Sequence, residues 1–152
     1  MKRPLAAGKQ AARAGRPAVQ YAALPYRQAG EVEILLVTSR ETRRWVIPKG
    51  WPMKGKKPHA AAAREALEEA GVTGRIGRSA LGAYPYVKWL GNGAPAPCRV
   101  RVFPLEVMRE RNVWPEMGQR ERRWFSVPDA AAAVDEPELA ELILTFDPVA
   151  AR

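Results

Sequence analysis

The stretch that most constrains this chain is residues 64–72, which read Arg-Glu-Ala-Leu-Glu-Glu-Ala-Gly-Val. Helical neighbours are three or four positions apart, so the spacing predicts a helix with Glu65, Glu68 and Glu69 on one side. Gly71 follows as the residue type that most readily takes the left-handed conformation that ends a helix. The last turn therefore carries carboxylates where the helix dipole is already negative. Such a cluster repels itself unless a cation lies within it, and a hard divalent cation such as Mg²⁺ accepts carboxylate oxygens.

The alternative is that these glutamates are an ordinary solvated pair on a surface helix. The residues around the helix favour a functional site instead. The small residues Ala60, Ala63, Leu67 and Ala70 predict an apolar face that packs closely while the glutamates point outward. Upstream, residues 45–50 (Trp-Val-Ile-Pro-Lys-Gly) predict a buried strand that runs into a loop. That loop, residues 49–57, contains four lysines, a composition that favours phosphate binding.

This arrangement resembles the signature of the Nudix hydrolase family. The signature is a Gly, five residues, a Glu, seven residues, Arg-Glu, an apolar residue, any residue, Glu-Glu, any residue, Gly and an apolar residue. The chain matches it at Gly50, Arg64, Glu65, Ala66, Glu68, Glu69, Gly71 and Val72. It departs from it once, with Lys56 in place of the first Glu. Residues 21–26, 33–40, 45–53 and 123–125 also resemble the diphosphoinositol and diadenosine polyphosphate branch, so the resemblance covers residues 18–146.

The resemblance implies roles for the residues that match. The paired glutamates of the signature bind Mg²⁺ or Mn²⁺ in the family, which here falls on Glu68 and Glu69. Glu65 is implied as a further metal ligand or as the base that activates water. A backbone carbonyl at Lys49 or Gly50 is implied to complete the coordination. Arg64 is implied to orient the glutamates, and it lies four residues before Glu68 on the same helix.

Family members often supply one more glutamate from a downstream loop, as a metal ligand or a base. In this chain the loop is residues 109–123, and it offers Glu116 and Glu121. The spacing does not decide between them, although Glu116 is slightly favoured because Gly-Gln follows shortly at 118–119. The alternative is that both glutamates only pair with neighbouring arginines.

The basic residues predict where an anionic substrate binds. Residues 40–57 contain seven basic residues and one acidic residue. A guanidinium fork matches phosphate oxygens in two-point contact, and a tryptophan in the lysine-rich loop could stack on a base, although tryptophan is more often a core residue. The candidate substrate-binding residues are Arg40, Arg44, Lys49, Trp51, Lys54, Lys56, Arg120 and Arg122.

Lys56 leaves two interpretations open. In the family, the Glu at this position pairs with the Arg of the signature, so a lysine here removes that support. Either Lys56 turns outward and contacts substrate phosphates together with Lys49, Lys54 and Lys57, or metal binding is weakened and the protein is slow or non-catalytic. The first interpretation is preferred because Glu65, Glu68 and Glu69 are intact.

Length and composition indicate the number of domains, the kind of partner and the location of the protein. The chain has 152 residues, which fits one domain with a real core, and a formal net charge of +9, which favours an anionic partner. We expect a flexible basic tail over residues 1–17, a Nudix domain over 18–147 and a short tail over 148–152. No stretch of the sequence is apolar over the length of a membrane span. The single cysteine, Cys98, excludes an internal disulfide and fits a reducing cytoplasmic location.

The order of elements predicts an α/β fold, namely an α/β/α sandwich with a mixed sheet. Strands are expected at 19–26, 33–39, 99–108 and 122–127, with one or two more within 75–87 and a loop over 90–97. Two helices, each opened by a proline, are expected at 128–134 and 137–146. Strands mixed with helices on two sides agree with the Nudix fold that the resemblance implies.

These observations together predict metal-dependent hydrolysis of a diphosphate linkage in an anionic small molecule. Diadenosine polyphosphates and diphosphoinositol polyphosphates are the leading substrate classes, on the strength of local charge and the resemblance. Two alternatives remain, because the chain is strongly basic and carries Lys56. One is removal of a 5′ pyrophosphate from RNA, and the other is a non-catalytic module that binds RNA or a nucleotide.

Overall fold

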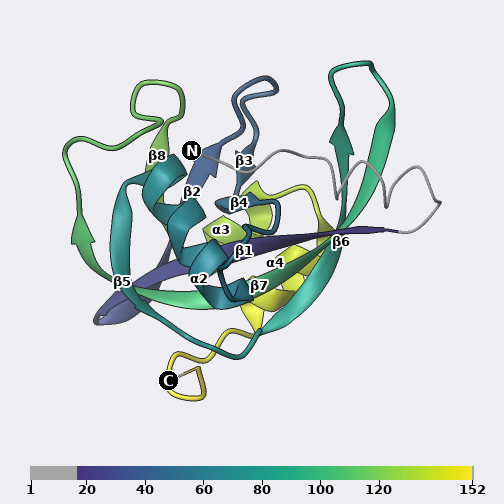
Figure 1. Cartoon of the computed structure of the whole chain (residues 1–152). Helices are drawn as coiled ribbons and strands as arrows, with labels where there is room; N and C mark the ends of the chain where they lie inside the picture. Colours follow the sequence, from purple (N-terminus) through teal and green to yellow (C-terminus); the bar gives the residue numbers. More distant parts are fainter. Residues whose placement is uncertain (1–16, 152) are drawn as a thin grey trace.

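The computed structural model describes residues 17–151, which form one mixed sheet of eight strands with helices on both sides (Figure 1). The predicted N-terminal tail lies outside the described residues except for Pro17, and the predicted domain limits remain a prediction. The strands are β1 Ala18–Ala29, β2 Glu31–Thr38, β3 Trp45–Val46, β4 Lys49–Gly50, β5 Val72–Ile76, β6 Gly82–Trp89, β7 Pro95–Glu110 and β8 Arg122–Ser126. The helical segments are α2 Pro58–Glu65, the π-helical turn η1 Ala66–Ala70, α3 Val127–Ala133 and α4 Pro137–Leu144.

The sheet is built around two long strands, β1 and β7, which run parallel to each other. The other pairings between the named strands are antiparallel. The order through the sheet is β3-β2-β1-β7-β5, with β4 paired to β1, β6 paired to β7 and β8 paired to β2. Because β4 is hydrogen-bonded to β1, it holds the start of the lysine-rich loop next to the centre of the sheet.

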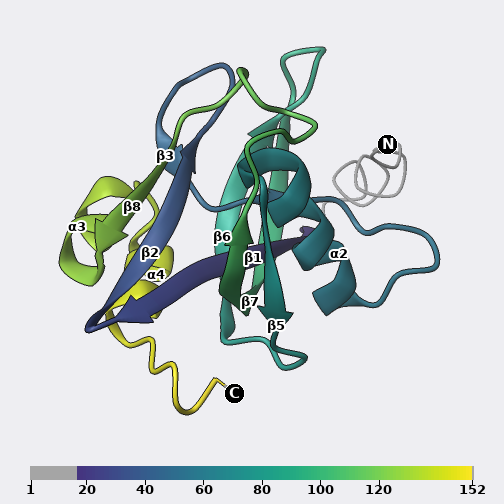
Figure 2. The same ribbon diagram turned by 90° about the vertical axis from the view of Figure 1, so that its left-hand side faces the viewer.

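Side chains that alternate along each strand fill two separate cores. On one face, Leu35 and Phe103 pack against Ala62 and Ala66 of the α2–η1 helix. On the opposite face, residues such as Ile34 pack against α3 and α4. Figure 2 shows α2 on one side of the sheet and α3 and α4 on the other. The predicted α/β/α sandwich with a mixed sheet is therefore confirmed.

The helix packs through a different face from the one predicted. The buried alanines are Ala61, Ala62, Ala66 and Ala70, whereas Ala60, Ala63 and Leu67 are only partly buried. The sequence pattern was ambiguous because alanines occupy positions 60–63 in succession and give no periodicity of their own. The small side chains let the helix lie close to the sheet, and this packing turns the glutamate side inward.

Strand β7 is longer than expected and the hairpin before it is correspondingly tighter. The predicted loop over 90–97 is reduced because β6 and β7 pair as far as Trp89 and Pro95. Pro104 lies where the partner of β7 changes, since Leu105 pairs with Ile76 of β5 and Val102 pairs with Gly82 of β6. A proline lacks an N–H, so it is best accommodated at such a change of partner.

The glutamate helix ends at Gly71, as predicted, and three residues fix that end. Gly71 has a φ angle of 68°, in the left-handed region. The guanidinium of Arg122 donates to the carbonyl oxygens of Ala70 at 2.9 Å and of Arg111 at 2.9 Å. It also lies over the ring of Trp114, 4.0 Å from the centroid. These contacts attach the end of the helix to the loop that precedes β8.

Across residues 17–151, no helix is both long and apolar enough to span a membrane. Residues 148–151 form a turn in which the amide of Ala151 donates to the carbonyl of Asp147 at 3.1 Å. Cys98 is a buried residue of β7, and burial raises the pKa of its thiol.

Replacing Gly71 by alanine should lower the free energy of unfolding by about 2–4 kcal/mol, because a left-handed φ and a steric overlap both penalise a side chain here. A Cβ at this position would lie 2.5 Å from the Trp114 ring. The matched control is Gly55→Ala, where φ is 79° but nothing lies within 4 Å. Chemical denaturation should show a loss of about 1–2 kcal/mol for the control. Equal losses in the two variants would contradict the packing role of the helix end.

Candidate functional site

The three glutamates of the helix are buried, and not directed outward as the sequence analysis expected. Glu65, Glu68 and Glu69 are only 1%, 5% and 3% exposed. The helix winds as an α-helix up to Glu65 and as a π-helix over Ala66–Ala70. A π-helical turn inside an α-helix is uncommon and often occurs at functional sites. Buried carboxylates need cations or hydrogen-bond donors close by, and the structure supplies both.

Gly50 explains how the helix approaches the sheet so closely. A Cβ added at this position would overlap the carboxylate of Glu65. The backbone amide of Lys49, the residue before Gly50, donates to Glu69 Oε1 at 3.4 Å. Strand β4 therefore presents its backbone to two of the three glutamates, and the approach of Glu65 leaves no room for a side chain at Gly50.

Two arginines compensate the buried carboxylates. Arg64 Nε donates to Glu68 Oε2 at 2.8 Å, as its spacing on the helix predicted. Arg120 has a side chain only 9% exposed and lies between Glu116 and Glu69, 2.9 Å and 3.7 Å from their carboxylate oxygens. It also donates to the carbonyl of Thr38 at 3.2 Å. A cation placed in this way lowers the cost of burying several negative charges together.

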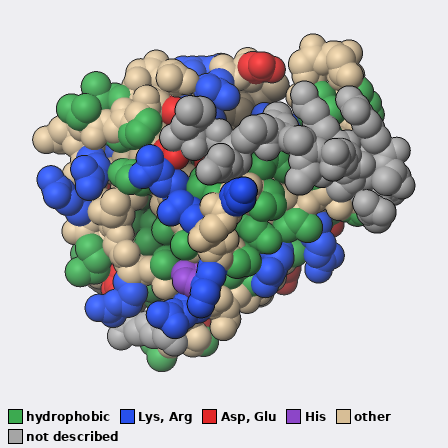
Figure 3. Space-filling view, viewed as in Figure 1, with side chains coloured by type: hydrophobic (Ala, Val, Ile, Leu, Met, Phe, Trp, Pro, Cys, Tyr) green, Lys and Arg blue, Asp and Glu red, His purple; other side chains and the backbone are tan. Residues whose placement is uncertain are grey.

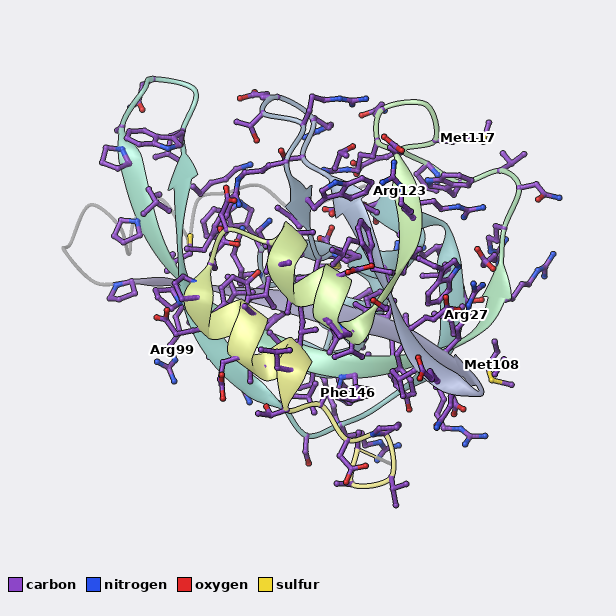
Figure 4. The ribbon with its side chains drawn as sticks, turned by 180° about the vertical axis from the view of Figure 1, so that it is seen from behind. Arg27, Arg99, Met108, Met117, Arg123 and Phe146 are labelled. Atoms are coloured by element: carbon purple, nitrogen blue, oxygen red, sulfur yellow. The ribbon has the colours of Figure 1, made fainter. Side chains whose placement is uncertain are left out.

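The structure brings Glu116 to this cluster and leaves Glu121 outside it. Glu116 is 9% exposed, and its backbone amide donates to the carbonyl of Glu68 at 3.0 Å. Glu121 has a side chain 51% exposed and pairs with Arg123 at 2.9 Å. The guanidinium of Arg123, which is labelled in Figure 4, lies 4.8 Å from the centroid of the Trp45 ring. The buried cluster thus contains Glu65, Glu68, Glu69, Glu116 and Arg120, and the partly exposed Arg64 lies at its edge.

A cavity of about 220 Å³ opens beside Glu69 and Gly50. Four of the predicted substrate-binding residues line it, namely Arg40, Lys49, Trp51 and Arg120. Eight further lining residues were not predicted from the sequence, among them Gln20, Tyr86, Lys88 and Trp89. Alternation along β6 could have placed Tyr86 and Lys88 on one face, but no motif marks the β6–β7 hairpin as part of the site.

Lys49 is the cation most affected by this environment. Its ammonium lies 4.2 Å from the centroid of the Tyr86 ring. Desolvation lowers the pKa of Lys49 from its ordinary value to about 8, although the negative charge of Glu69 acts in the opposite direction. Lys49 is therefore a poorly hydrated cation that faces the cavity beside a carboxylate.

Arg44 and Arg122 do not line the cavity. Arg44 pairs with Glu136 at 2.8 Å, and its guanidinium lies 5.3 Å from the Tyr86 centroid. Arg44 therefore supports Tyr86, which lines the cavity, without lining the cavity itself. Burial lowers the pKa of Arg44, but the contact with Glu136 raises it, and the net shift is upward. Arg122 is used at the helix end described above, so phosphate contact is not the role that its position supports.

Lys54 and Lys56 are exposed and are not among the residues that line the cavity. They belong to a basic surface around the start of α2. Figure 3 shows Lys and Arg side chains spread over this face, around the lone histidine, and Asp and Glu side chains at few places. The outward orientation proposed for Lys56 agrees with its exposure, whereas its contact with substrate remains a prediction.

The cluster offers carboxylate and carbonyl oxygens, which are the ligand atoms that hard divalent cations take. As the side chains stand, no three Asp, Glu, His or Cys residues within 17–151 are gathered closely enough to hold an ion. Glu68 is engaged by Arg64, and Glu69 faces Arg120. An ion on these glutamates would compete with the two arginines, so the metal ligands remain a prediction.

Comparison with known proteins identifies the family. The NUDIX domain matches residues 16–146, so this chain belongs to the NUDIX family. It is 38% identical over 112 residues to human diphosphoinositol polyphosphate phosphohydrolase 3-alpha, which covers 72% of this chain and 64% of that protein. It is 35% identical over 109 residues to Nudix hydrolase 13, mitochondrial, of Arabidopsis thaliana, which covers 66% of this chain and 52% of that protein.

The chain thus spans between about half and two thirds of the length of these curated relatives. Among solved structures, an Ap4A hydrolase from C. elegans in a binary complex has a TM-score of 0.64 at 24% identity. The match covers 88% of this chain and 98% of that one, and it shows a shared fold. The cytoplasmic location stays a prediction, since plant relatives are named as mitochondrial or chloroplastic.

Gly50→Ala should disturb the site directly, because the new methyl group must displace the Glu65 carboxylate or push α2 from the sheet. We expect a loss of about 1–3 kcal/mol in the free energy of unfolding, as for other overpacked positions. The control is Gly91→Ala, since nothing lies within 4 Å of a Cβ there. Denaturation curves that coincide for the two variants would contradict the close approach.

Proposed function

We propose that this chain hydrolyses a diphosphate linkage in an anionic small molecule with the help of a divalent cation, Mg²⁺ or Mn²⁺. The observation that carries the proposal is the cluster of four buried glutamates next to a cavity lined by several cations. Such a cluster is costly to build for folding alone, since each buried charge loses its hydration. Membership of the NUDIX family supports the same reaction class.

In this proposal Glu68 and Glu69 hold the cation, with Glu65 and the backbone at Gly50 as further ligands. When bound, the cation would neutralise charge on the pyrophosphate oxygens and lower the pKa of a bound water. Glu116 is the candidate base, because it belongs to the buried cluster and comes from a different element. Glu121 is not retained in that role, because it is exposed and paired with Arg123.

The cations of the cavity have separate roles in this proposal. Arg40 and Lys49 bind phosphate oxygens, and Lys49 is the stronger candidate because a poorly hydrated ammonium loses little on contact with an anion. Arg120 connects the cavity to the glutamate cluster. It lines the cavity, and it pairs with Glu69 and Glu116 of the cluster. It is thus placed to leave a carboxylate and approach a phosphate when substrate binds.

Diadenosine polyphosphates and diphosphoinositol polyphosphates are the proposed substrate classes. One relative is named for diphosphoinositol polyphosphate and one structural neighbour for Ap4A, and the cationic cavity is compatible with both. Removal of the 5′ pyrophosphate of RNA is a second candidate, favoured by the net charge of +9 and the exposed lysines at the start of α2.

Glu69→Gln should reduce hydrolysis by at least about 100-fold across a panel of nucleoside diphosphate derivatives, dinucleoside polyphosphates, inositol pyrophosphates and 5′-triphosphorylated RNA with Mg²⁺ or Mn²⁺. The change removes one buried negative charge while keeping the shape of the side chain. Glu121→Gln is the matched control, because it makes the same chemical change at an exposed position, and its rate should stay within about twofold.

Release of phosphate or nucleotide is the measurement for both variants. Should Glu69→Gln release product as fast as the wild type, the hydrolase proposal fails. If no member of the panel is turned over but RNA binds with a steep dependence on salt and none on metal, the chain is a binding module instead.

Lys56→Glu tests whether the natural site is impaired by the missing carboxylate. Lys56 is exposed and its charge is screened by water and salt, so we expect kcat to change by less than about threefold. Lys57→Glu alters the neighbouring exposed lysine in the same way and serves as the control. A rise in kcat of tenfold or more for Lys56→Glu alone would show that the lysine weakens the natural site.

A further inference from the structure

Arg43 has a backbone conformation that few side chains adopt. Its φ angle is 57°, and it is the one residue other than glycine with a positive φ within residues 17–151. The left-handed region crowds the Cβ of an L-residue, so glycine or asparagine is the ordinary choice there. A larger residue that is held in this region calls for an explanation.

The turn that contains Arg43 does not itself need an arginine. It joins β2 to β3 and is closed by backbone contacts. The amide of Ser39 donates to the carbonyl of Arg44 at 2.8 Å, and the amide of Arg43 donates to the carbonyl of Ser39 at 3.0 Å. A glycine at position 43 would make the same contacts without crowding a Cβ. The reason for an arginine therefore lies in its side chain.

The side chain of Arg43 binds a second loop, which covers residues 111–121 and precedes β8. Arg43 Nη1 donates to the backbone carbonyl of Gln119 at 3.1 Å. Figures 1 and 2 show the β2–β3 loop next to the loop that leads into β8. A hydrogen bond from a charged donor is stronger than one between neutral groups. Arg43 thus connects two segments that are distant in the sequence.

The loop that Arg43 binds carries two charged residues of the buried cluster. The amide of Gln119 donates to the carbonyl of Glu116 at 3.0 Å, and the amide of Glu116 donates to the carbonyl of Glu68 at 3.0 Å. Arg120 follows Gln119 directly, and its Nε donates to Glu116 Oε1 at 2.9 Å. A short series of contacts therefore leads from Arg43 to Glu116 and Arg120.

Arg40 contacts the same glutamine but has a different position. Arg40 Nη1 donates to the side-chain Oε1 of Gln119 at 3.3 Å, and Arg40 lines the cavity. A phosphate oxygen is a stronger acceptor for this guanidinium than a neutral amide oxygen is. Arg43 does not line the cavity and binds the backbone of Gln119 instead. Its contact with the loop is therefore kept when Arg40 turns to a phosphate.

We infer that Arg43 is a positioning residue, which holds the loop of Gln119 so that Glu116 and Arg120 stay at the glutamate cluster. The inference rests on the proposed function, in which Glu116 is the candidate base and Arg120 approaches a phosphate. Arg43 itself touches neither the substrate nor the reacting atoms. Loss of its contact should slow the reaction without weakening substrate binding, whereas loss of Arg40 should weaken binding.

Arg43→Asn removes the guanidinium and introduces a residue type that tolerates the left-handed conformation. The substrate is the member of the panel that the wild type hydrolyses fastest. We expect kcat to fall about tenfold and KM to stay within about twofold, because a small displacement of a catalytic group is costly in rate. Tm should not fall, since the turn keeps its backbone contacts. Arg40→Ala should instead raise KM at least about fivefold.

Two further variants separate the contact from the charge. Arg43→Lys keeps a donor for the carbonyl of Gln119, so kcat should stay within about threefold of the wild-type value. Arg78→Asn removes the same charge at an exposed position that does not line the cavity. It should leave both kcat and KM within about twofold.

Amide hydrogen exchange tests the contact without turnover. The amides of Glu116 and Gln119 should exchange at least about tenfold faster in Arg43→Asn, and at nearly the wild-type rate in Arg43→Lys. Equal exchange in the wild type and Arg43→Asn overturns the inference, and so does faster exchange with an unchanged kcat. Faster exchange that lysine prevents, in a protein that hydrolyses nothing in the panel, supports the positioning of the loop while the hydrolase proposal fails.

Discussion

The structure depends on the close packing of β4 against the α2–η1 helix. The contact surfaces are a glycine on the strand and alanines on the helix. Gly50 leaves room for the Glu65 carboxylate, and Ala62 and Ala66 leave room for the sheet. This close approach buries glutamates that would otherwise be hydrated, and burial makes their interactions with cations strong. Arg120 then becomes necessary, because like charges in a poorly hydrated place need an opposite charge among them.

Much of the architecture could be predicted because local signals agree with the final fold. Gly71 stops the helix at the expected residue, prolines open α3 and α4, and runs of apolar residues mark β1 and β2. The membership in the family follows from the spacing between Gly50 and Val72. These features depend on backbone preferences and on short-range periodicity, which a sequence expresses directly.

What could not be predicted depends on contacts between distant segments. The inward face of the glutamate helix is decided by β4, and the choice between Glu116 and Glu121 is decided by which one meets Glu68. Arg122 resembles a phosphate ligand in the sequence because it belongs to a run of basic residues. Its guanidinium is instead held by backbone carbonyls and by Trp114, a set of contacts that no pattern in residues 109–123 announces.

The π-helical turn at Ala66–Ala70 limits how this segment could change during evolution. Each hydrogen bond there encloses one residue more than in an α-helix, so the turn holds one residue beyond regular winding. Loss of one residue would let the helix reach Gly71 smoothly, but it would rotate Glu68 and Glu69 by about 100° relative to Glu65. The number of residues between Glu65 and Gly71 therefore fixes the directions of these glutamates relative to one another.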